Sequence, residues 1–420
     1  MSVPGRKTME PAAVSLTPRQ IVDALDQYVI GQGAAKRAVA IALRSRYRRR
    51  LAPEEIRDDI LPANILMIGP TGVGKTEIAR RLARLAGAPF LKVEASKFTE
   101  VGYAGRDVES MIRDLTEIGV AMVRGEMMAA ERERAGKHVE ERLLNLLVPR
   151  SQRGRARRTQ RGRARGELVI AAGAALSEGD DTGSAEDDWT QRRLLCRKEL
   201  RAGSLDTRMV EIDVASRRPP AGDLFVQLGL DDNDPAWGEA IEQIFPQRKK
   251  RRRVSVREAR DLLLQEELGR LVDREEVVRI ALERVQENGI IFLDEIDKVC
   301  SQEGSARSGP DVSREGVQRD LLPIVEGSAV STRHGVVRTD HILFVAAGAF
   351  HTVRPSDLIP ELQGRLPIRV ELSELSREDY LRILREPRNS LVRQYQALLR
   401  SEGVELQFTP SALERLAEIA

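Results

Sequence analysis

The sequence predicts an α/β fold in which helices cover both faces of a parallel sheet. An apolar run at 64–68 is followed by a glycine-rich turn, an amphipathic helical segment and a second apolar run at 90–93. This strand–helix–strand order is typical of a parallel sheet. Apolar runs at 290–293 and 341–347 supply further strands, and alternating side chains at 366–372 predict a half-exposed one. The sheet therefore draws its strands from both halves of the chain.

The first helical segment is predicted over residues 18–48, with an interruption at 31–33. Beyond the interruption, apolar residues recur at the 3.6-residue period of a helix that buries one face. The helix after the glycine-rich turn has the same period, with Ile78, Ala79 and Leu82 on one side. Both segments are therefore expected to cover the sheet.

The middle of the chain differs from this pattern. Helical stretches at 113–147 and 256–286 flank an interior in which charge is segregated. Eight arginines and no acid occur at 150–165, six acids and no base at 178–188, and six consecutive basic residues at 248–253. Such blocks cannot bury a core and are usually disordered or solvated. We therefore predict an inserted, mainly helical domain with a disordered charged centre.

These patterns divide the chain into three parts. The sheet domain is discontinuous and occupies residues 1–112 and 282–372, and the inserted domain occupies residues 113–281. Residues 373–420 are expected to form a helical C-terminal subdomain, the lid of the sheet domain, whose first helix opens on a capping box at Ser376. The apolar stripe of its last helix continues to the final residue, so we expect the chain to end inside this subdomain.

Composition excludes several classes of protein. Apolar residues make up 41% and charged residues 32% of the 420 residues, which is a globular composition rather than a collagenous or wholly disordered one. The formal net charge of +3 does not point to nucleic acid. Cys196 and Cys300 are the two cysteines, which predicts no disulfide framework and fits a reducing cytosol. Because no apolar run is long enough for a membrane span and the N-terminus lacks the apolar segment of a signal peptide, we expect a cytoplasmic protein without a membrane partner.

Residues 69–76 read GPTGVGKT and match the phosphate-binding loop pattern GxxxxGK[ST]. Gly72 and Gly74 let backbone amides turn toward phosphate oxygens at the positive end of the following helix. Lys75 would reach the β- and γ-phosphates, and the Thr76 hydroxyl would coordinate Mg²⁺. The alternative is a chance glycine-rich turn, which the strand before the motif and the helix after it disfavour.

A second motif follows the apolar run at 290–293, where Asp294 and Glu295 are adjacent. The carboxyl ends of parallel strands are where α/β sheets bind ligands. Asp294 would hold Mg²⁺ through water, and Glu295 would orient or deprotonate the attacking water. The alternative is an acidic helix start with Asp294 as the N-cap. Pairing with the phosphate-binding loop disfavours this alternative. The acid Glu295 beside the metal-binding Asp294 favours nucleotide hydrolysis over simple nucleotide binding.

Arg365 precedes the half-exposed strand at 366–372. An arginine in this position could reach the γ-phosphate bound by a neighbouring subunit, where such a residue typically supplies about 10³ to 10⁵ in rate. From the residues alone, a surface salt bridge is the simpler interpretation.

Together these motifs resemble the HslU (ClpY) family, the AAA+ ATPase rings of two-component bacterial proteases. The matching segments are YVIGQ at 28–32, GPTGVGKTEIARRLA at 69–83, KFTEVGYAG at 97–105, FLDEIDK at 292–298, SGPDVSREGVQRDLLPIVEG at 308–327 and DLIPELQGRLPIRVEL at 357–372. They span most of residues 16–112 and 289–408, whereas the inserted region matches weakly.

The resemblance implies an AAA+ nucleotide-binding domain that hydrolyses ATP with Mg²⁺, in a homo-hexamer with one site at each subunit boundary. Ile30 would pack against the adenine. The phosphates would be held by Gly72, Val73, Gly74, Lys75, Thr76 and Glu77. Asp294 and Glu295 keep the roles given above, and Glu361 and Arg365 would belong to the boundary, with Arg365 acting in trans.

Gly102, Tyr103, Ala104 and Gly105 resemble the family's pore loop, which grips unfolded polypeptide. A broad aromatic side chain can push a polypeptide of any sequence by contact alone. From the residues alone, Tyr103 would be a turn or core residue. The resemblance implies an unfoldase that threads protein substrates into a partner peptidase of the HslV type and has no peptidase activity of its own.

The sequence departs from the family pattern in several places. The family's pore loop usually reads Gly-Tyr-Val-Gly, so Ala104 offers a smaller contact. The strand at 341–347 ends in alanines and glycine, where a hydroxyl or amide would help to position the lytic water. The arginine-rich run at 150–165 is not a family feature. We also expect the chain to end before the family's Gly-Ala-Arg motif and peptidase-docking tail.

Two other functions remain open at this stage. A nucleotide-binding scaffold with impaired hydrolysis would follow from an incomplete C-terminal lid. An AAA+ nucleic-acid remodeller would use the basic runs at 150–165 and 248–253 to neutralise phosphates. Those runs lack interleaved aromatic residues for base stacking, so we expect no nucleic-acid partner.

Overall fold

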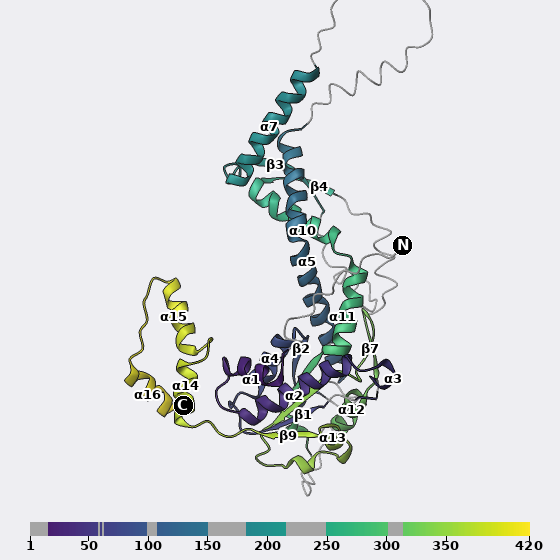
Figure 1. Cartoon of the computed structure of the whole chain (residues 1–420), viewed down its shortest axis with the longest axis vertical. Helices are drawn as coiled ribbons and strands as arrows, with labels where there is room; N and C mark the ends of the chain where they lie inside the picture. Colours follow the sequence, from purple (N-terminus) through teal and green to yellow (C-terminus); the bar gives the residue numbers. More distant parts are fainter. Residues whose placement is uncertain are drawn as a thin grey trace, which may run out of the picture. The chain divides into compact units, whose positions relative to one another are not determined.

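The computed structural model describes residues 16–57, 59–60, 63–98, 107–149, 182–215, 249–300 and 314–420. The chain divides into two compact units, which Figure 1 colours along the sequence. One unit comprises Met1–Val123 and Glu275–Ala420, and the other comprises Arg124–Arg274. The second unit is thus an insertion in the sequence of the first. The three-part division with boundaries at 113, 282 and 373 remains a prediction.

A sheet of five parallel strands organises the described part of the first unit, in the order β2-β5-β8-β1-β9. Its strands are β1 (Ile65–Ile68), β2 (Phe90–Glu94), β5 (Ile290–Asp294), β8 (Leu343–Gly348) and β9 (Ile368–Glu371). The predicted parallel α/β fold is confirmed. Because all the strands run the same way, the segments that follow them meet at one edge, the carboxyl edge of the sheet.

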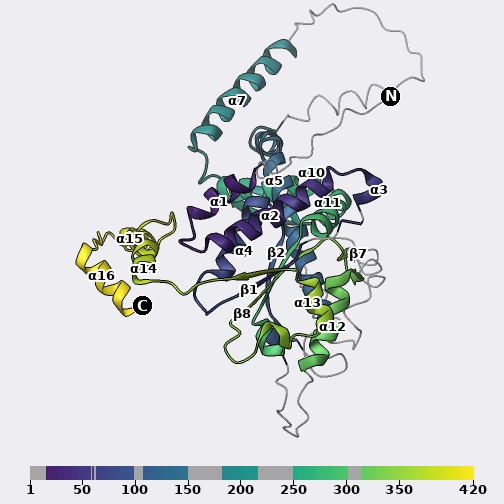
Figure 2. The same ribbon diagram turned by 60° about the horizontal axis from the view of Figure 1, so that its bottom comes forward.

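One face of this sheet is covered by α1 (Pro18–Asp26), α2 (Gly33–Arg50) and α4 (Lys75–Ala86), which Figure 2 shows grouped together. Side chains of the three helices pack against alternate strand residues such as Met67 and Phe292. Burial of this apolar area is the main force that holds the helices on the sheet.

The other face is covered by the first turns of α5 (Ser110–Leu147), by α11 (Arg274–Asn288) and by α12 (Arg314–Glu326). The strand residues here are the neighbours of those above, for example Leu66 and Leu293. Side chains alternate across a strand, so a run that is apolar at every position must be buried on both faces. The continuous apolar runs in the sequence therefore predicted the two helical layers correctly.

The helix starts follow the capping signals in the sequence. Thr17 caps α1 with Gln20 as its reciprocal partner, and Ser376 caps α14 (Arg377–Arg385) with Asp379 in the same arrangement. Two further C-terminal helices, α15 (Leu391–Ser401) and α16 (Pro410–Ile419), complete the first unit. Arg377 on α14 forms an ion pair with Glu418 on α16 at 2.6 Å. The predicted capping box at Ser376 is thus confirmed.

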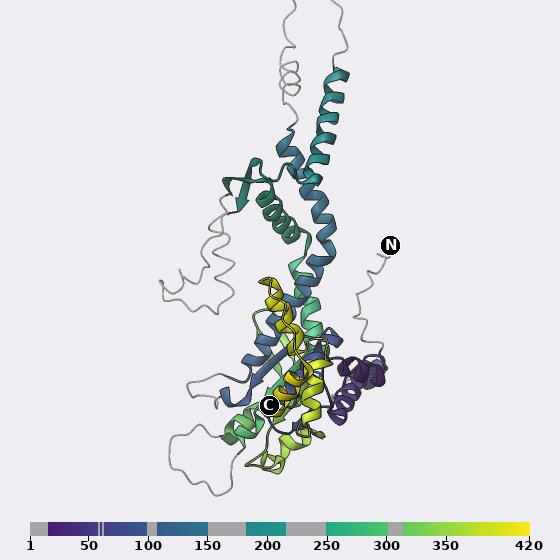
Figure 3. The ribbon, with the colours of Figure 1, turned by 90° about the vertical axis from the view of Figure 1, so that its left-hand side faces the viewer.

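The second unit has its own core, formed by the rest of α5, α7 (Thr182–Ala202), α10 (Val256–Leu271) and the antiparallel pair β3 (Met209–Ala215) and β4 (Lys249–Ser255). Figure 3 shows α7 running beside the end of α5. Ion pairs join these two helices, including Arg197 Nε with Glu140 Oε1 at 3.1 Å. The described part of this unit is therefore folded around Leu143, Leu200 and Val254.

The basic run at 248–253 corrects one expectation. We predicted disordered or solvated chain. Residues 249–253 lie in β4 and are therefore not disordered, whereas the exposed side chains of Arg251, Arg252 and Arg253 agree with the solvated alternative. Across the strand pair Arg251 lies opposite Asp213, with 3.6 Å between Nε and Oδ1, and Arg253 lies opposite Glu211. Facing charges of opposite sign favour the pairing of the two strands. The arginine-rich run at 150–165 lies outside the described residues.

A second correction concerns the helix predicted over 256–286. The structure has two helices there, α10 and α11, because Val272 adopts an extended conformation between them.

The remaining described elements are α3 (Glu54–Arg57), the short helices η2 (Ala95–Lys97), η3 (Ile296–Val299) and η4 (Pro355–Asp357), α13 (Pro360–Arg365) and the hairpin of β6 (Ala329–Thr332) and β7 (Gly335–Arg338). Among the described helices, none is both long and apolar enough to cross a membrane.

Candidate nucleotide-binding site

The phosphate-binding loop lies at the carboxyl edge, between β1 and α4. Gly69 follows β1, and its N–H donates to the Gly348 carbonyl at 3.1 Å. A side chain at Gly69 would place its Cβ 2.6 Å from the Leu372 carbonyl oxygen, so only glycine fits there. Gly74 begins α4 with a φ of 99°, a left-handed conformation that favours glycine. The glycines thus shape a loop that ends at a helix N-terminus.

Lys75 is buried at the start of α4, with 8% of its surface exposed. Its Nζ donates to the carbonyl of Gly69 and, at 2.8 Å, to that of Pro70. Burial lowers the pKa of Lys75, and the negative charges of Asp294 and Asp297 partly oppose this shift. The loop lysine and the acidic motif thus lie at the same edge of the sheet.

Asp294 is the last residue of β5, and Lys92 on the neighbouring strand β2 forms an ion pair with its Oδ2 at 2.7 Å. Glu295 follows with a φ of 57°, and its Oε2 accepts from Ser96 Oγ at 3.0 Å. The Glu295 N–H donates to Asp294 Oδ1 at 3.1 Å. Asp294 is not the N-cap of the following short helix η3, because Glu295 occupies that position. The N-cap role proposed for Asp294 in the alternative interpretation is therefore wrong, although a short acidic helix does begin after the strand.

The donor set suits a hard cation. The Thr76 hydroxyl has no hydrogen-bond partner among the described residues, and Asp294 offers carboxylate oxygens at the same edge. No cluster of three or more metal-ligating side chains occurs within the described ranges. Mg²⁺ at nucleotide sites needs none, because phosphate oxygens and waters supply most of its ligands.

The segment between α1 and α2 lies beside this loop. Val29 and Ile30 are 7% and 5% exposed, and a Cβ built on Gly74 would lie 3.6 Å from Val29 Cγ1. Gln32 adopts a left-handed φ of 55°, and its Nε2 donates to the Ser373 carbonyl at 2.8 Å. Ile30 follows Val29 in this segment, and its contact with the base stays a prediction.

Val73 and Glu77 are also at the loop, but their side chains point to different surroundings. Val73 is buried in the core beneath α1, α2 and α4. The Glu77 carboxylate accepts from Arg81 Nε at 2.7 Å and from Arg80 Nη1 at 3.4 Å. Arg81 in turn lies 4.1 Å from the centre of the Tyr28 ring. At Val73 and Glu77 the backbone N–H, rather than the side chain, is therefore the group that a phosphate could contact.

Arg365 and Glu361 are not brought to the loop of their own chain. Both lie on α13, which precedes β9 at the opposite, amino edge of the sheet. The Arg365 carbonyl accepts from Asn64 Nδ2 at 3.1 Å, just before β1, whereas Gly69 follows β1. Five residues of parallel strand span about 16 Å. The Arg365 side chain forms an ion pair with Glu326 at 3.0 Å, and Glu361 is exposed.

The pore-loop candidates Gly102, Tyr103, Ala104 and Gly105 lie outside the described residues. The end of β8 carries no hydroxyl or amide side chain that could position the lytic water. A Cβ on Gly348 there would lie 2.9 Å from Asp297 Oδ1. Lys92 and Ser96 were not predicted. These two residues lie four positions apart, in β2 and just after it. They contact Asp294 and Glu295 because β2 pairs with β5, and a sequence pattern does not reveal that pairing.

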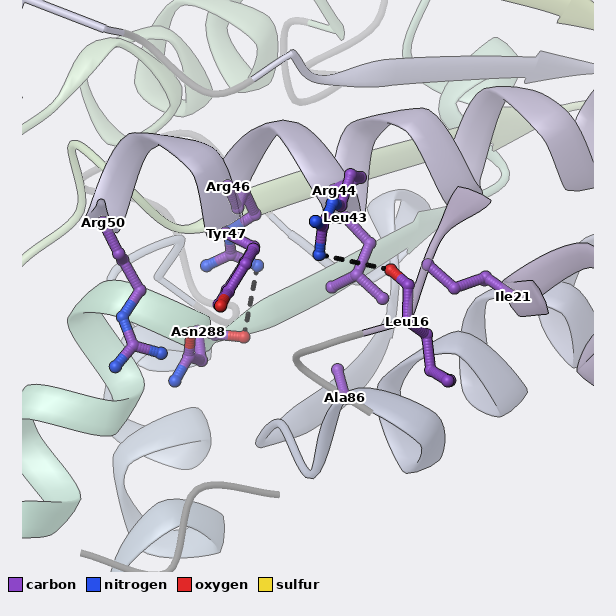
Figure 4. A pocket seen from close by; sticks show the side chains of 9 residues that line it. All are labelled: Leu16, Ile21, Leu43, Arg44, Arg46, Tyr47, Arg50, Ala86 and Asn288. Carbon is purple, nitrogen blue, oxygen red and sulfur yellow. Dashed lines mark hydrogen bonds between the residues drawn. The ribbon is translucent and has the colours of Figure 1, made fainter. Parts of the chain in front are cut away.

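A hollow at the amino edge has a different character (Figure 4). It is lined by apolar side chains that include Ile21, Leu43 and Ala86, and by Tyr47 and Asn288. Of its three arginines, Arg46 is buried and points to the carbonyl of Asn288, at 3.2 Å. This hollow is far from the phosphate-binding loop, because Asn288 precedes β5 whereas Asp294 ends it.

Comparison with known proteins identifies matching families and relatives. The model of the ATPase family associated with various cellular activities (AAA) matches residues 65–177, and that of the AAA domain (Cdc48 subfamily) matches residues 235–369. The chain is 50% identical over 406 residues to the ATP-dependent protease ATPase subunit ClpY of Bacillus velezensis, covering 96% of this chain and 85% of that protein. It is 52% identical to subunits named HslU from Geobacillus sp. and Nitratidesulfovibrio vulgaris, covering 97% of this chain and 86% of each relative.

Proposed function

The chain belongs to the HslU/ClpY family of ATP-dependent protease ATPase subunits, and on that premise we propose that it couples Mg²⁺-dependent ATP hydrolysis to the unfolding of protein substrates. The observation that carries the proposal is the position of the two motifs at one edge of a parallel sheet, with Lys75 at the start of α4 after β1 and with Asp294 and Glu295 at the end of β5. A cation for the phosphates, a ligand for a metal and a carboxylate for the attacking water are the parts that phosphoryl transfer to water needs.

The residues of the site divide this work. The Lys75 ammonium exchanges the carbonyls of Gly69 and Pro70 for phosphate oxygens, and the loop amides, including those of Gly72 and Glu77, complete the cradle. Thr76 and Asp294 would hold Mg²⁺, which would neutralise charge on the phosphates. Glu295 orients the attacking water and accepts its proton once its carboxylate leaves Ser96.

The proposed assembly is a homo-hexameric ring with one site at each boundary. Arg365 and Glu361 lie at the amino edge, about 16 Å along the sheet from the loop of their own chain. This separation supports a role in trans, in which Arg365 reaches the γ-phosphate held by the neighbouring copy. The Glu326 ion pair keeps the guanidinium on the surface, where a second copy can approach.

Threading is assigned to the segment of residues 102–105, with Tyr103 as the gripping residue. The partner is a peptidase of the HslV type, and the present chain supplies no peptide hydrolysis. We place the complex in the cytoplasm. A nucleic-acid substrate is disfavoured because described arginines of the basic run face acids, with Arg252 also 3.1 Å from Glu258.

The test is ATP-driven unfolding of a stable, tagged fluorescent substrate. The wild type should hydrolyse ATP and extinguish the fluorescence in the presence of Mg²⁺. Glu295→Gln should bind ATP with unchanged affinity and lose turnover by about a hundredfold or more, because general base catalysis typically supplies 10² to 10⁴. Tyr103→Ala should keep hydrolysis and lose unfolding.

Each arm can contradict the proposal separately. ATP binding without hydrolysis in the wild type would support the scaffold alternative. Full unfolding by Tyr103→Ala would remove the assignment of the pore loop while leaving the ATPase assignment intact.

A further inference from the structure

A groove lies within the second unit, among α5, α7 and α10. Its volume is about 330 Å³, at the lower end of the roughly 300–1,000 Å³ typical of ligand sites. Leu143 and Leu200, which belong to the core of the unit, and the half-buried Leu264 line it with apolar side chains. One arginine from each of the three helices also lines it, and none of the described lining residues is aromatic. The groove thus combines apolar and positively charged groups.

Gly136 keeps this groove open. It lies inside α5, where glycine is less favourable than alanine because it loses more backbone freedom on folding. Close packing does not require it, since a Cβ at Gly136 would meet no atom within 4 Å. On the same helix, by contrast, a Cβ on Gly119 would lie 2.5 Å from Val285 Cγ2. Because Gly136 lines the groove, a longer side chain at this position would fill it.

Two of the lining arginines are held by groups of the same unit. Arg201 on α7 forms an ion pair with Glu140 on α5, with 3.0 Å between Nη2 and Oε1. Arg260 on α10 donates from Nη2 to the Leu200 carbonyl at 2.9 Å and lies 3.7 Å from Asp206. A guanidinium has five N–H donors, so these contacts orient both groups without using all of their donors.

Arg132 on α5 differs from these two, because it is exposed and has no ion-pair partner among the described residues. The acids beside it on the helix have other partners. Glu131 pairs with Arg134 at 3.6 Å, and Glu133 pairs with Lys137 at 2.8 Å. Three arginines and a single acid line the groove in the described part of the chain. The groove is therefore positively charged, with Arg132 as its available cation.

This combination of groups fits a polypeptide of a particular composition. Arginine binds carboxylates through paired hydrogen bonds, and aliphatic side chains gain from contact with leucine. Single-stranded nucleic acid would need aromatic side chains for stacking, which the described lining lacks. We propose that the groove binds unfolded substrate segments in which acidic and aliphatic residues are neighbours. A carboxylate binds Arg132, and an aliphatic side chain fills the space that Gly136 leaves. This inference rests on the unfolding function proposed above and names the class of segment that it favours.

The experiment measures binding of labelled peptides to the full chain by fluorescence anisotropy. Three peptides share their leucine positions and carry glutamate, glutamine or lysine between them. The wild type should bind the glutamate peptide about tenfold more tightly than the glutamine peptide, as expected for two exposed carboxylate–arginine pairs. The lysine peptide should bind most weakly, and added salt should reduce the differences. Arg132→Gln should lower the preference for glutamate about threefold. Arg134→Gln is the control, because Arg134 is exposed on the same helix and does not line the groove.

A second pair of variants fills the groove without disturbing the fold. Gly136→Met should weaken binding of the glutamate and glutamine peptides about tenfold, because the new side chain leans toward the N-terminus of α5 and covers the groove. Methionine is a better helix former than glycine, so the melting temperature should not fall. Gly125→Met is the matched control, since a Cβ at Gly125 also meets no atom within 4 Å and Gly125 does not line the groove. In ATP-driven unfolding of a substrate with a glutamate–leucine tag, Gly136→Met should raise KM about tenfold, whereas Gly125→Met should keep the wild-type KM.

The outcomes separate this inference from the proposed function. Equal binding of the three peptides by the wild type, or wild-type affinity in Gly136→Met, would overturn the inference. An oligonucleotide that binds as tightly as the glutamate peptide, and is lost in Gly136→Met, would overturn the choice of polypeptide. A wild type that binds the glutamate peptide but unfolds no tagged substrate with ATP would overturn the proposed function and leave the groove as a peptide site.

Discussion

Two buried cations at opposite edges of the same sheet show how similar groups acquire different roles. At the carboxyl edge, Lys75 donates to the carbonyls of Gly69 and Pro70, which belong to a loop. At the amino edge, Arg46 donates to the carbonyls of Glu287, at 2.6 Å, Asn288 and His341. These carbonyls lie at the end of α11 and just before β8, so Arg46 fixes parts of the frame itself.

Burial does not distinguish the two cations. It lowers the pKa of Lys75, and it lowers the pKa of Arg46 to about 10, which still leaves the guanidinium charged at neutral pH. The difference lies in the partners. Loop carbonyls can be exchanged for phosphate, whereas the carbonyls at the end of a packed helix cannot move away. The comparison predicts that carboxyl-edge variants lose chemistry and amino-edge variants lose stability.

Arg365 provides the severest test of this division, because it lies at the amino edge and is proposed to act in catalysis. Arg365→Ala should lower kcat for ATP by about a thousandfold, as expected for an arginine that reaches the γ-phosphate in trans. Its surface ion pair with Glu326 contributes at most about 1 kcal/mol, so the free energy of unfolding should hardly change. Steady-state hydrolysis and urea titration measure the two quantities.

Mixing subunits checks that the action is in trans. Glu295→Gln and Arg365→Ala subunits are each expected to be inactive alone. In mixed rings some sites combine an intact Glu295 with an intact Arg365 from the neighbour, so part of the hydrolysis should return. If mixed rings form and remain inactive, the role in trans is wrong.

Arg46→Met should have the next largest effect. It leaves three carbonyl groups without their donor, and unpaired buried groups are each typically costly, so we expect a loss of about 3 kcal/mol in the free energy of unfolding. Urea denaturation measures the loss. The control is Arg44→Met, because Arg44 is half-buried on the same helix and donates to Leu16 at 3.3 Å. Equal stability of the two variants would contradict the structural role of Arg46.

Lys75→Met should have the smallest effect on stability and still abolish nucleotide binding. Its two acceptors lie in a loop that water can reach when the side chain is shortened, so the free energy of unfolding should change by less than about 1 kcal/mol. Fluorescent ADP binding and thermal melting give the two readouts. A large drop in melting temperature would show that Lys75, like Arg46, belongs to the frame.

Local patterns predicted the strands, most helices and the two nucleotide motifs, because each depends on neighbouring residues. Gly69 to Thr76 and Asp294–Glu295 could be found from their spacing and their flanking apolar runs. The order of strands could not, because pairing of β2 with β5 depends on tertiary packing. For the same reason Lys92 and Ser96 escaped prediction. Sequence patterns did not reveal that the basic run forms the strand β4, because the acids opposite it lie far away along the chain, on β3.

The backbone at Glu295 has a consequence for laboratory selection. Among the described residues, Gln32, Glu295 and Phe350 are the non-glycine residues with positive φ, at 55°, 57° and 53°. A left-handed conformation costs an L-residue roughly 1–2 kcal/mol, and glycine removes that cost. A directed-evolution campaign that rewards heat tolerance alone would therefore favour glycine at position 295 and discard the carboxylate. Any screen for robust variants of this chain has to score turnover together with melting temperature.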